Sequence, residues 1–231
     1  MFKNQEKVKI RWKDNFAYAI GLITADGCLS SDKRHISLSS KDLEMINNLK
    51  VALVLGNKTR RNARGGEKEK RYFVVEFGDK VFYQFLNSIG LHSAKSKTIK
   101  SVQIPDQWFS SFLRGLFDGD GTFYSSWDKR WPNSFIFKMS FASASPDFVK
   151  WLGQSLTRLY GVKGFIRKGD GVFNLIYCKG DSRKLYNAMY YKKNLLYLTR
   201  KYDKIRGILE RDKGLGKPFL QKQRNAAVAQ W

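Results

Sequence analysis

The spacing of apolar and polar residues divides the chain into two stretches that share one order of elements. Each predicts a helix, extended segments, a second helix, a β-rich hairpin and a third helix. In the first stretch we expect these over Asn15–Ala25, His35–Ser39, Asp42–Leu55, the hairpin Asn57–Arg64 with Arg71–Gly78, and Val81–Ile89. In the second we expect Asp106–Gly121, Phe135–Ser143, Pro146–Tyr160, the hairpin Val162–Lys168 with Val172–Cys178, and Ser182–Tyr191.

Local signals support several of these boundaries. Asp14 suits the N-cap of the first helix, and Pro146 suits a first helical turn. Gly56 and Gly161 stand where the second helix of each stretch is expected to stop. The order predicts an α+β protein of two pseudo-symmetric αββαββα halves. We place the halves at residues 8–98 and 108–210, with a linker at 99–107 that contains Pro105 and a peripheral extension at 211–231.

The first predicted helix of each half carries a related motif. Ala19–Gly27 reads AIGLITADG and Leu113–Gly121 reads LRGLFDGDG, at an offset of 94 residues (120 − 26). Glycine inside a helix costs about 1 kcal/mol relative to alanine, so small residues here must bring a compensating gain. Close packing of the two helices across a pseudo-two-fold axis provides it. The residues expected at this helix interface are Gly21, Ala25, Gly115 and Gly119.

Each motif also ends in an aspartate, Asp26 or Asp120. A carboxylate at a helix C-terminus faces the negative end of the helix dipole, and pairing two such ends adds like-charge repulsion. Hard divalent cations bind carboxylate oxygens, and two metals about 4 Å apart stabilise the attacking and leaving oxygens of a phosphodiester displacement. Two ordinary Asp-Gly turns are the alternative interpretation. A calcium loop starting at Asp118 is excluded, because Lys129 stands at its last ligand position.

Charge and composition favour a polyanionic partner. Lys and Arg number 43 and Asp and Glu 20, which gives a net charge of +23, while 42% hydrophobic residues indicate a folded chain. A general nucleic-acid-coating protein remains an alternative. Two distant cysteines and two histidines argue against a zinc site or a Ser-His-Asp hydrolase. No membrane span and no secretion signal are recognisable, so we expect an intracellular protein.

The two motifs and the order of elements around them resemble the single-chain, two-motif LAGLIDADG homing endonucleases, over nearly the whole of residues 14–211. The resemblance implies curved antiparallel sheets that form a saddle on double-stranded DNA, and a monomer that needs no protein partner. It also implies cleavage of both strands with short 3′ overhangs. Asp26 and Asp120 would coordinate Mg²⁺, in a site of two or three divalent cations where Mn²⁺ can substitute. The sixth motif position departs from the consensus Asp at Thr24 and keeps it at Asp118.

The same resemblance implies a lysine near the active site in each half, at Lys95 and Lys201. A lysine there would polarise the scissile phosphate or perturb the attacking water; a solvated phosphate contact is the alternative. Ser40 and Ser145 fit an N-cap role better than a place in the water or metal shell.

Basic and amide side chains on the predicted hairpins, together with the loop Tyr124–Asn133, are the expected DNA contacts. On a strand, residues two apart face the same way, and Arg suits guanine while Asn suits adenine in the major groove. A solvated charged hairpin is the alternative. The candidate contacts are Arg60, Asn62, Arg64, Lys68, Arg71, Lys129, Arg130, Lys163, Arg167, Lys168 and Asn174.

Two other functions fit the same scaffold. An RNA-binding intron maturase could retain both aspartates. A non-cleaving DNA-binding regulator predicts decay of the acidic pair, and both members are present.

Overall fold

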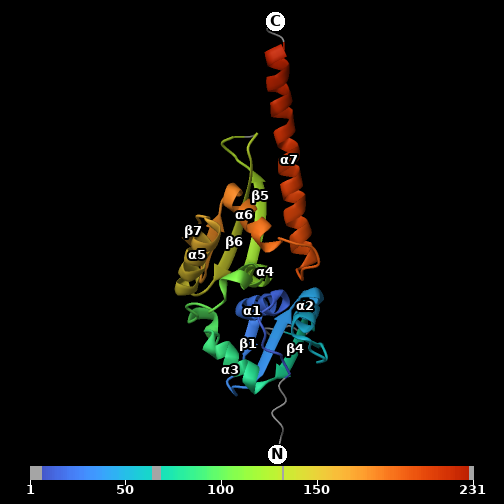
Figure 1. The fold of residues 1–231 in the computed structure, drawn as a ribbon, viewed down its shortest axis with the longest axis vertical. Helices are drawn as coiled ribbons and strands as arrows, with labels where there is room; N and C mark the ends of the chain where they lie inside the picture. The colour runs from blue at the N-terminus through green and yellow to red at the C-terminus, as the bar shows by residue number, and fades with distance from the viewer. Residues whose placement is uncertain (1–6, 64–68, 132, 229–231) are drawn as a thin grey trace, which may run out of the picture.

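A computed structural model describes residues 7–63, 69–131 and 133–228, with side chains up to residue 215. The molecule consists of two halves of similar architecture, stacked end to end with helices α1 and α4 between them (Figure 1). This arrangement agrees with the α+β fold of two αββαββα halves that the sequence predicts.

The first half builds a four-stranded antiparallel sheet of order β1-β2-β4-β3. Alternate residues such as Ile36, Leu38, Val75 and Phe77 are fully or almost fully buried, because they face the helices that pack on one side of the sheet. Its elements are α1 (Asp14–Asp26), β1 (Gly27–Leu29), β2 (His35–Ser40), α2 (Leu43–Leu53), β3 (Arg60–Asn62), β4 (Tyr72–Gly78) and α3 (Lys80–Ser88).

The second half repeats this sheet as β5-β6-β8-β7. Its core is rich in aromatic side chains, among them Phe117, Phe137, Phe141 and Tyr177, all at most 2% exposed. Its elements are α4 (Phe109–Asp120), β5 (Gly121–Trp127), β6 (Phe135–Ser143), α5 (Pro146–Tyr160), β7 (Phe165–Lys168), β8 (Phe173–Tyr177) and α6 (Lys179–Met189).

Two 3₁₀ turns and one long helix complete the described chain. The turns η1 (Lys95–Lys97) and η2 (Asp106–Trp108) lie along the connection between the halves. Helix α7 (Thr199–Val228) starts near the junction of the halves, runs past β5 and projects beyond the second half (Figure 1). It continues through residue 211, where the sequence suggested that an extension begins. Among the described residues no helix has the length and apolar character needed to cross a membrane.

Four local expectations were wrong. Helix α2 ends at Leu53, and its C-cap residue is Val54, not Gly56. Val54 takes the left-handed conformation (φ 57°), and Leu55 then lies in the core. Helix α1 has Lys13 at its N-cap, and Asp14 lies inside the first turn. Ser40 accepts a bond from the Asp42 amide (3.1 Å), so Asp42 and not Ser40 takes the N-cap position of α2. Strand β5 includes Tyr124–Trp127, which the sequence placed in a loop, because this segment pairs with β6.

Backbone contact between α1 and α4 is the central packing feature. A Cβ atom on Gly21 would lie 2.7 Å from the Leu116 nitrogen and 2.9 Å from the Gly115 Cα. A Cβ on Gly115 would overlap the Tyr18 carbonyl oxygen. Both collisions are with backbone, which cannot rotate away as a side chain can. The two helices therefore approach at a distance that only glycine permits at these positions.

Replacing Gly115 with alanine should destabilise the protein. The added methyl must push the two helices apart, and overpacking of this kind typically costs about 1–3 kcal/mol. Gly207→Ala is the matched control, because its Cβ would meet nothing within 4 Å and alanine favours a helix by up to about 1 kcal/mol. Urea unfolding should show a lower midpoint for Gly115→Ala and an equal or higher one for Gly207→Ala. Equal midpoints for Gly115→Ala and the unmodified chain would contradict the packing argument.

Candidate active site

The close packing brings the C-terminal ends of α1 and α4 together. A Cβ on Gly119 would lie 2.8 Å from the Asp26 Oδ2 and would overlap the Ala25 Cβ, so the residue before Asp120 touches the Asp26 carboxylate region. Asp26 is exposed and Asp120 is half-buried. Beside them lies a cleft of about 200 Å³ whose lining includes Ala25, Lys95, Asp120 and Ser143. The two motif aspartates thus share one site at the junction of the halves.

The electrostatics of this site disfavour negative charge. Burial, and secondly the charge of Asp26, raise the pKa of Asp120 to about 6. The charges of Lys95 and Lys201 act in the opposite direction and do not cancel the effect. When both carboxylates are ionised they repel each other, and a cation between them would reduce this repulsion.

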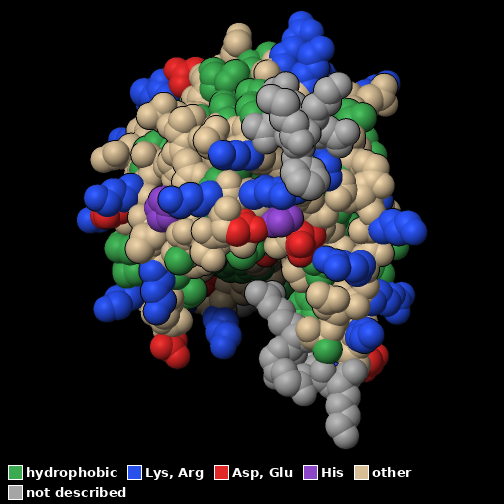
Figure 2. Space-filling model, turned by 90° about the horizontal axis from the view of Figure 1, so that it is seen from below, with side chains coloured by type: hydrophobic (Ala, Val, Ile, Leu, Met, Phe, Trp, Pro, Cys, Tyr) green, Lys and Arg blue, Asp and Glu red, His purple; other side chains and the backbone are tan. Residues whose placement is uncertain are grey.

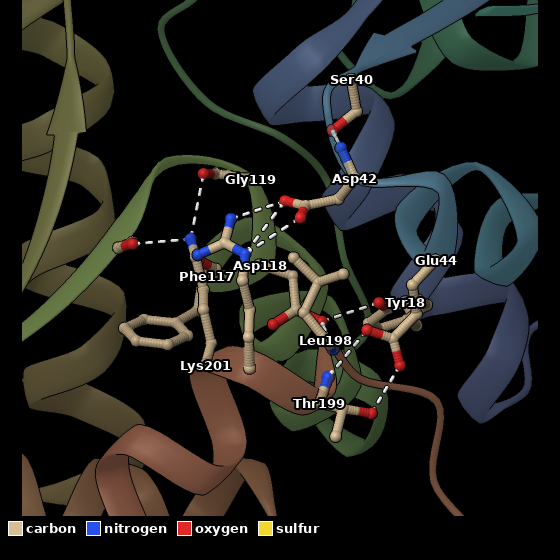
Figure 3. Close-up of polar contacts among 12 residues, drawn as sticks. Tyr18, Ser40, Asp42, Glu44, Phe117, Asp118, Gly119, Leu198, Thr199 and Lys201 are labelled. Atoms are coloured by element: carbon tan, nitrogen blue, oxygen red, sulfur yellow. Dashed lines mark hydrogen bonds and ion pairs between the residues drawn. The ribbon is translucent and has the colours of Figure 1, made fainter. Parts of the chain in front are cut away.

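The two lysines lie at equivalent places and bind helix ends. Lys95 Nζ donates to the Gly27 carbonyl oxygen at 2.6 Å, and Lys201 Nζ donates to the equivalent oxygen of Gly121 at 2.7 Å. Lys201 also donates to the oxygens of Phe117 (2.7 Å) and Gly119 (3.1 Å), as Figure 3 shows. Its three N–H bonds are all used by carbonyls. Each ammonium group thus neutralises the negative end of a motif helix beside the carboxylates.

Lys95 is buried and Lys201 is half-buried, and burial lowers the pKa of each. Lys95 is 6% exposed, and the pKa of Lys201 falls to about 8. Nearby carboxylates oppose this shift: Asp120 and Asp26 for Lys95, and chiefly Asp118 for Lys201. The family resemblance implied a lysine at each of these places; it gave no indication that backbone carbonyls would be their hydrogen-bond partners.

The sixth motif position is buried in both helices, but Thr24 also lines the cleft, whereas Asp118 does not. Thr24 Oγ1 donates to the Ile20 carbonyl at 2.7 Å within its own helix. Asp118 is fully buried and accepts bonds from the Tyr18 hydroxyl (2.7 Å) and the Leu198 amide (2.9 Å). Burial raises the pKa of Asp118 to about 6. Asp118 therefore ties α4 to α1 and to the start of α7, away from the cleft.

The start of α7 joins the two halves through contacts that the sequence analysis missed. Glu44 at the start of α2 accepts a bond from the Thr199 amide at 3.0 Å, and Asp42 pairs with Arg200 at 2.6 Å (Figure 3). The next residue is Lys201, which reaches the end of α4. A segment of three residues thus connects the first half to the C-terminal end of α4 in the second half. Acidic residues in the first turn of α2 were the available signal, but nothing in the sequence pointed to their partner.

Ser145 has the N-cap role that the sequence predicted. Its Oγ accepts a bond from the Phe148 amide at 3.3 Å and donates to the Ile99 carbonyl at 2.5 Å. Its hydroxyl is therefore occupied by backbone and is turned away from a metal shell.

The candidate DNA contacts lie on or beside the sheets. Arg60 with Asn62, and Arg167 with Asn174, project from the sheet faces opposite the buried core, whereas Lys168 points to the other side of β7. Viewed from the first half, basic side chains are spread around the molecule with few acidic ones between them (Figure 2). Arg71 pairs with Glu69, Arg130 pairs with Asp128 beside Lys129, and Lys163 precedes β7. Arg64 and Lys68 lie outside the described residues.

The residues present fit a divalent cation. Asp26 and Asp120 supply hard oxygen donors and carry the unfavourable charge that a cation would neutralise. Within the described part of the chain no cluster of three or more Asp, Glu, His or Cys side chains forms a metal site. An ion held by this pair would therefore complete its coordination with water and substrate oxygens.

Replacing Asp120 with asparagine should stabilise the metal-free protein at pH 7. The folded pKa of about 6 lies above the ordinary 3.8, so the ionised group opposes folding. A shift of about two units corresponds to roughly 1–3 kcal/mol. The increase in the free energy of unfolding should be full above pH 6, shrink as the pH falls from 6 to 4, and vanish below about pH 4. Urea unfolding in EDTA at pH 4 and pH 7 measures this increase, and Asp170→Asn, in an exposed turn, is the control. A gain of equal size at pH 4 and pH 7 would contradict the charge argument.

Comparisons with known proteins agree with this architecture. A family model described as LAGLIDADG-like domain matches residues 14–90 and 108–198, well over half of the chain. The meganuclease I-SmaMI bound to uncleavable DNA is similar in structure, with a TM-score of 0.58, 15% identity, and coverage of 94% of this chain and 96% of that one. The homing endonuclease I-WcaI bound to its DNA recognition sequence is also similar, with a TM-score of 0.58, 14% identity, and coverage of 82% of this chain and 86% of that one.

Full-length DUF199/WhiA from Thermatoga maritima is also similar, with a TM-score of 0.55, 17% identity, and coverage of 97% of this chain and 72% of that one. At these identities the likeness establishes the fold. No curated protein matches the chain in a sequence comparison. With the motif aspartates, the glycine-packed helices and both halves in place, the chain belongs to the LAGLIDADG-like domain family.

Proposed function

We propose that the protein is a site-specific homing endonuclease that makes metal-dependent double-strand breaks in a long DNA target and leaves short 3′ overhangs. The observation that carries this proposal is the proximity of Asp26 and Asp120 at the ends of the packed helices, beside a cleft that Asp120 lines, where burial and the charge of Asp26 raise the pKa of Asp120. The surroundings disfavour the ionised form of Asp120, which lies at the end of a central helix beside a second carboxylate. Binding of a metal ion would offset that cost and would account for the pair.

Mg²⁺, or Mn²⁺ in its place, would be held by the two carboxylates, in a site of two or three divalent cations. When bound, such ions stabilise the charge of the attacking and leaving oxygens in phosphodiester displacement. The chain's own contribution is positional. Glycine packing fixes the separation of the two carboxylates, and Lys95 and Lys201 offset the negative helix ends beside them.

The outward faces of the two sheets would hold the DNA on either side of this centre. Arg60, Asn62, Arg167 and Asn174 lie on those faces, and the net charge of +23 favours a phosphate backbone. The solved structures of I-SmaMI and I-WcaI, which have this fold, contain bound DNA. Since one chain supplies both halves, a monomer inside the cell would suffice.

The deciding experiment exposes a randomised or genomic double-stranded DNA library to the protein in Mg²⁺, with an EDTA control, and sequences the new ends. The proposal predicts cuts at one long site, short 3′ overhangs and no cutting in EDTA. Tight retention of DNA without cuts would favour the regulator, and retention of RNA the maturase.

Asp26→Asn and Asp120→Asn should each lower the cutting rate by at least about 100-fold, because even outer-shell partners of a metal contribute factors of 10 to 100. DNA affinity in Ca²⁺ should change little, since the amide keeps the shape of the side chain. Asp170→Asn, which is exposed and far along the chain from either motif, should cut normally. Gel-shift and cleavage assays on one target measure both quantities. Full cutting by either asparagine variant would refute the site assignment.

A further inference from the structure

The registers of the two sheets allow their outward faces to be compared position by position. Gly27 pairs with Leu38 at the start of the first sheet, and Gly121 pairs with Phe141 at the start of the second. The sheets have the same strand order and all their pairs are antiparallel. Each residue on one outward face therefore has a defined counterpart on the other.

One cross-strand row ends in arginine in both halves. In the first sheet the row runs Ser39–Val74–Arg60, and in the second it runs Ala142–Asn174–Arg167. Arg60 and Arg167 are thus counterparts under the pseudo-two-fold axis, and both are exposed.

The surroundings of these two arginines differ. Arg60 is held by Glu76, with Nη2 to Oε2 at 3.2 Å. Arg167 has no hydrogen bond or ion pair with any described residue and lies opposite Asn174. Both guanidinium groups remain able to present two parallel donors to a base, since Glu76 engages only one edge of Arg60.

The adjacent row breaks the symmetry. It runs Cys28–Ser37–Glu76 in the first sheet, whereas in the second it runs Thr122–Ser140–Ile176–Phe165. A carboxylate in one half is therefore replaced by an apolar pair in the other. Phe165 is 46% exposed on a face that includes Lys138, whose ammonium group lies 5.9 Å from the ring centroid.

An exposed aromatic side chain such as Phe165 on a face that also carries Arg167 and Lys138 does not serve phosphate binding, whereas Ile176 beside it is 7% exposed and supports the ring from below. Phe165 fits the one apolar feature of the major groove, the methyl group of thymine. The counterpart carboxylate of Glu76 accepts hydrogen bonds and fits a base with an exocyclic amino group, cytosine or adenine. Rows on one face are two residues, about 7 Å, apart, which spans about two base-pair steps of 3.4 Å.

We propose that the DNA target carries one guanine in each half, at positions mirrored about its centre, read by Arg60 and Arg167. Within about two base pairs of the second guanine, Phe165 selects thymine. At the mirrored place in the first half, Glu76 selects cytosine or adenine. This inference rests on the proposed function and adds the bases of the target. The two half-sites would carry the same base at one position and different bases at the neighbouring position.

The test selects bound sequences from a randomised double-stranded pool in Ca²⁺ and sequences them, for the unmodified protein and for Arg60→Ala, Arg167→Ala and Phe165→Ala. The unmodified protein should enrich mirrored guanines. Each arginine variant should lose the preference in one half only, by roughly 5- to 150-fold, and Phe165→Ala should relax the thymine alone. Lys150→Ala is the matched control, because this exposed basic residue lies on α5, which packs against the opposite side of the second sheet, and it should change no base preference.

The outcomes separate the inference from the function beneath it. An enriched target without mirrored guanines, or one whose base preferences survive both arginine substitutions, overturns the inference. If that target is still cut in Mg²⁺, the proposed function stands. A pool with no enriched sequence and no Mg²⁺-dependent cutting removes the proposed function and the inference together.

Discussion

The structure depends on one contact, the backbone-to-backbone packing of α1 against α4. Gly21 and Gly115 lie where a single methyl group would collide with the main chain of the opposite helix. Because the collision is with backbone, no rearrangement of side chains could relieve it. This contact sets the distance between the halves and hence between the carboxylates at the helix ends. It also fixes the axis about which the two sheets, and any DNA held by them, are related.

The same contact creates an electrostatic cost that the surrounding structure only partly offsets. Two carboxylates meet at the negative ends of two helices, where burial already raises the pKa of Asp120. Lys95 and Lys201 bring positive charge to the same place through hydrogen bonds to the carbonyl oxygens at the helix ends. The start of α7, held by Asp42 and Glu44 of the first half, delivers Lys201 to this position. The lysines thus stabilise the helix ends, whereas the carboxylates are the groups proposed to bind a cation.

The features that could be predicted from the sequence are those with local or repeated signals. The two motifs, their glycines and the order of elements could be predicted from residue spacing alone, because a pattern that occurs twice in one chain predicts two halves of the same fold. Features that depend on distant partners could not be predicted. The left-handed Val54, where Gly56 seemed the natural stop, reflects the burial of Leu55. The carbonyl partners of Lys201 and the pairing of Asp42 with Arg200 join residues about 80 and 158 positions apart. Propensity carries no information at that range.

The central claim is that Asp26 and Asp120 together bind the metal ions that cut DNA. The most direct measurement is a crystal structure of the protein on its DNA target grown with Mn²⁺, with the ions located by anomalous scattering. The account predicts Mn²⁺ in contact with both carboxylates and with oxygens of the scissile phosphates. Ions bound elsewhere, or a DNA complex in which neither aspartate touches metal, would contradict it.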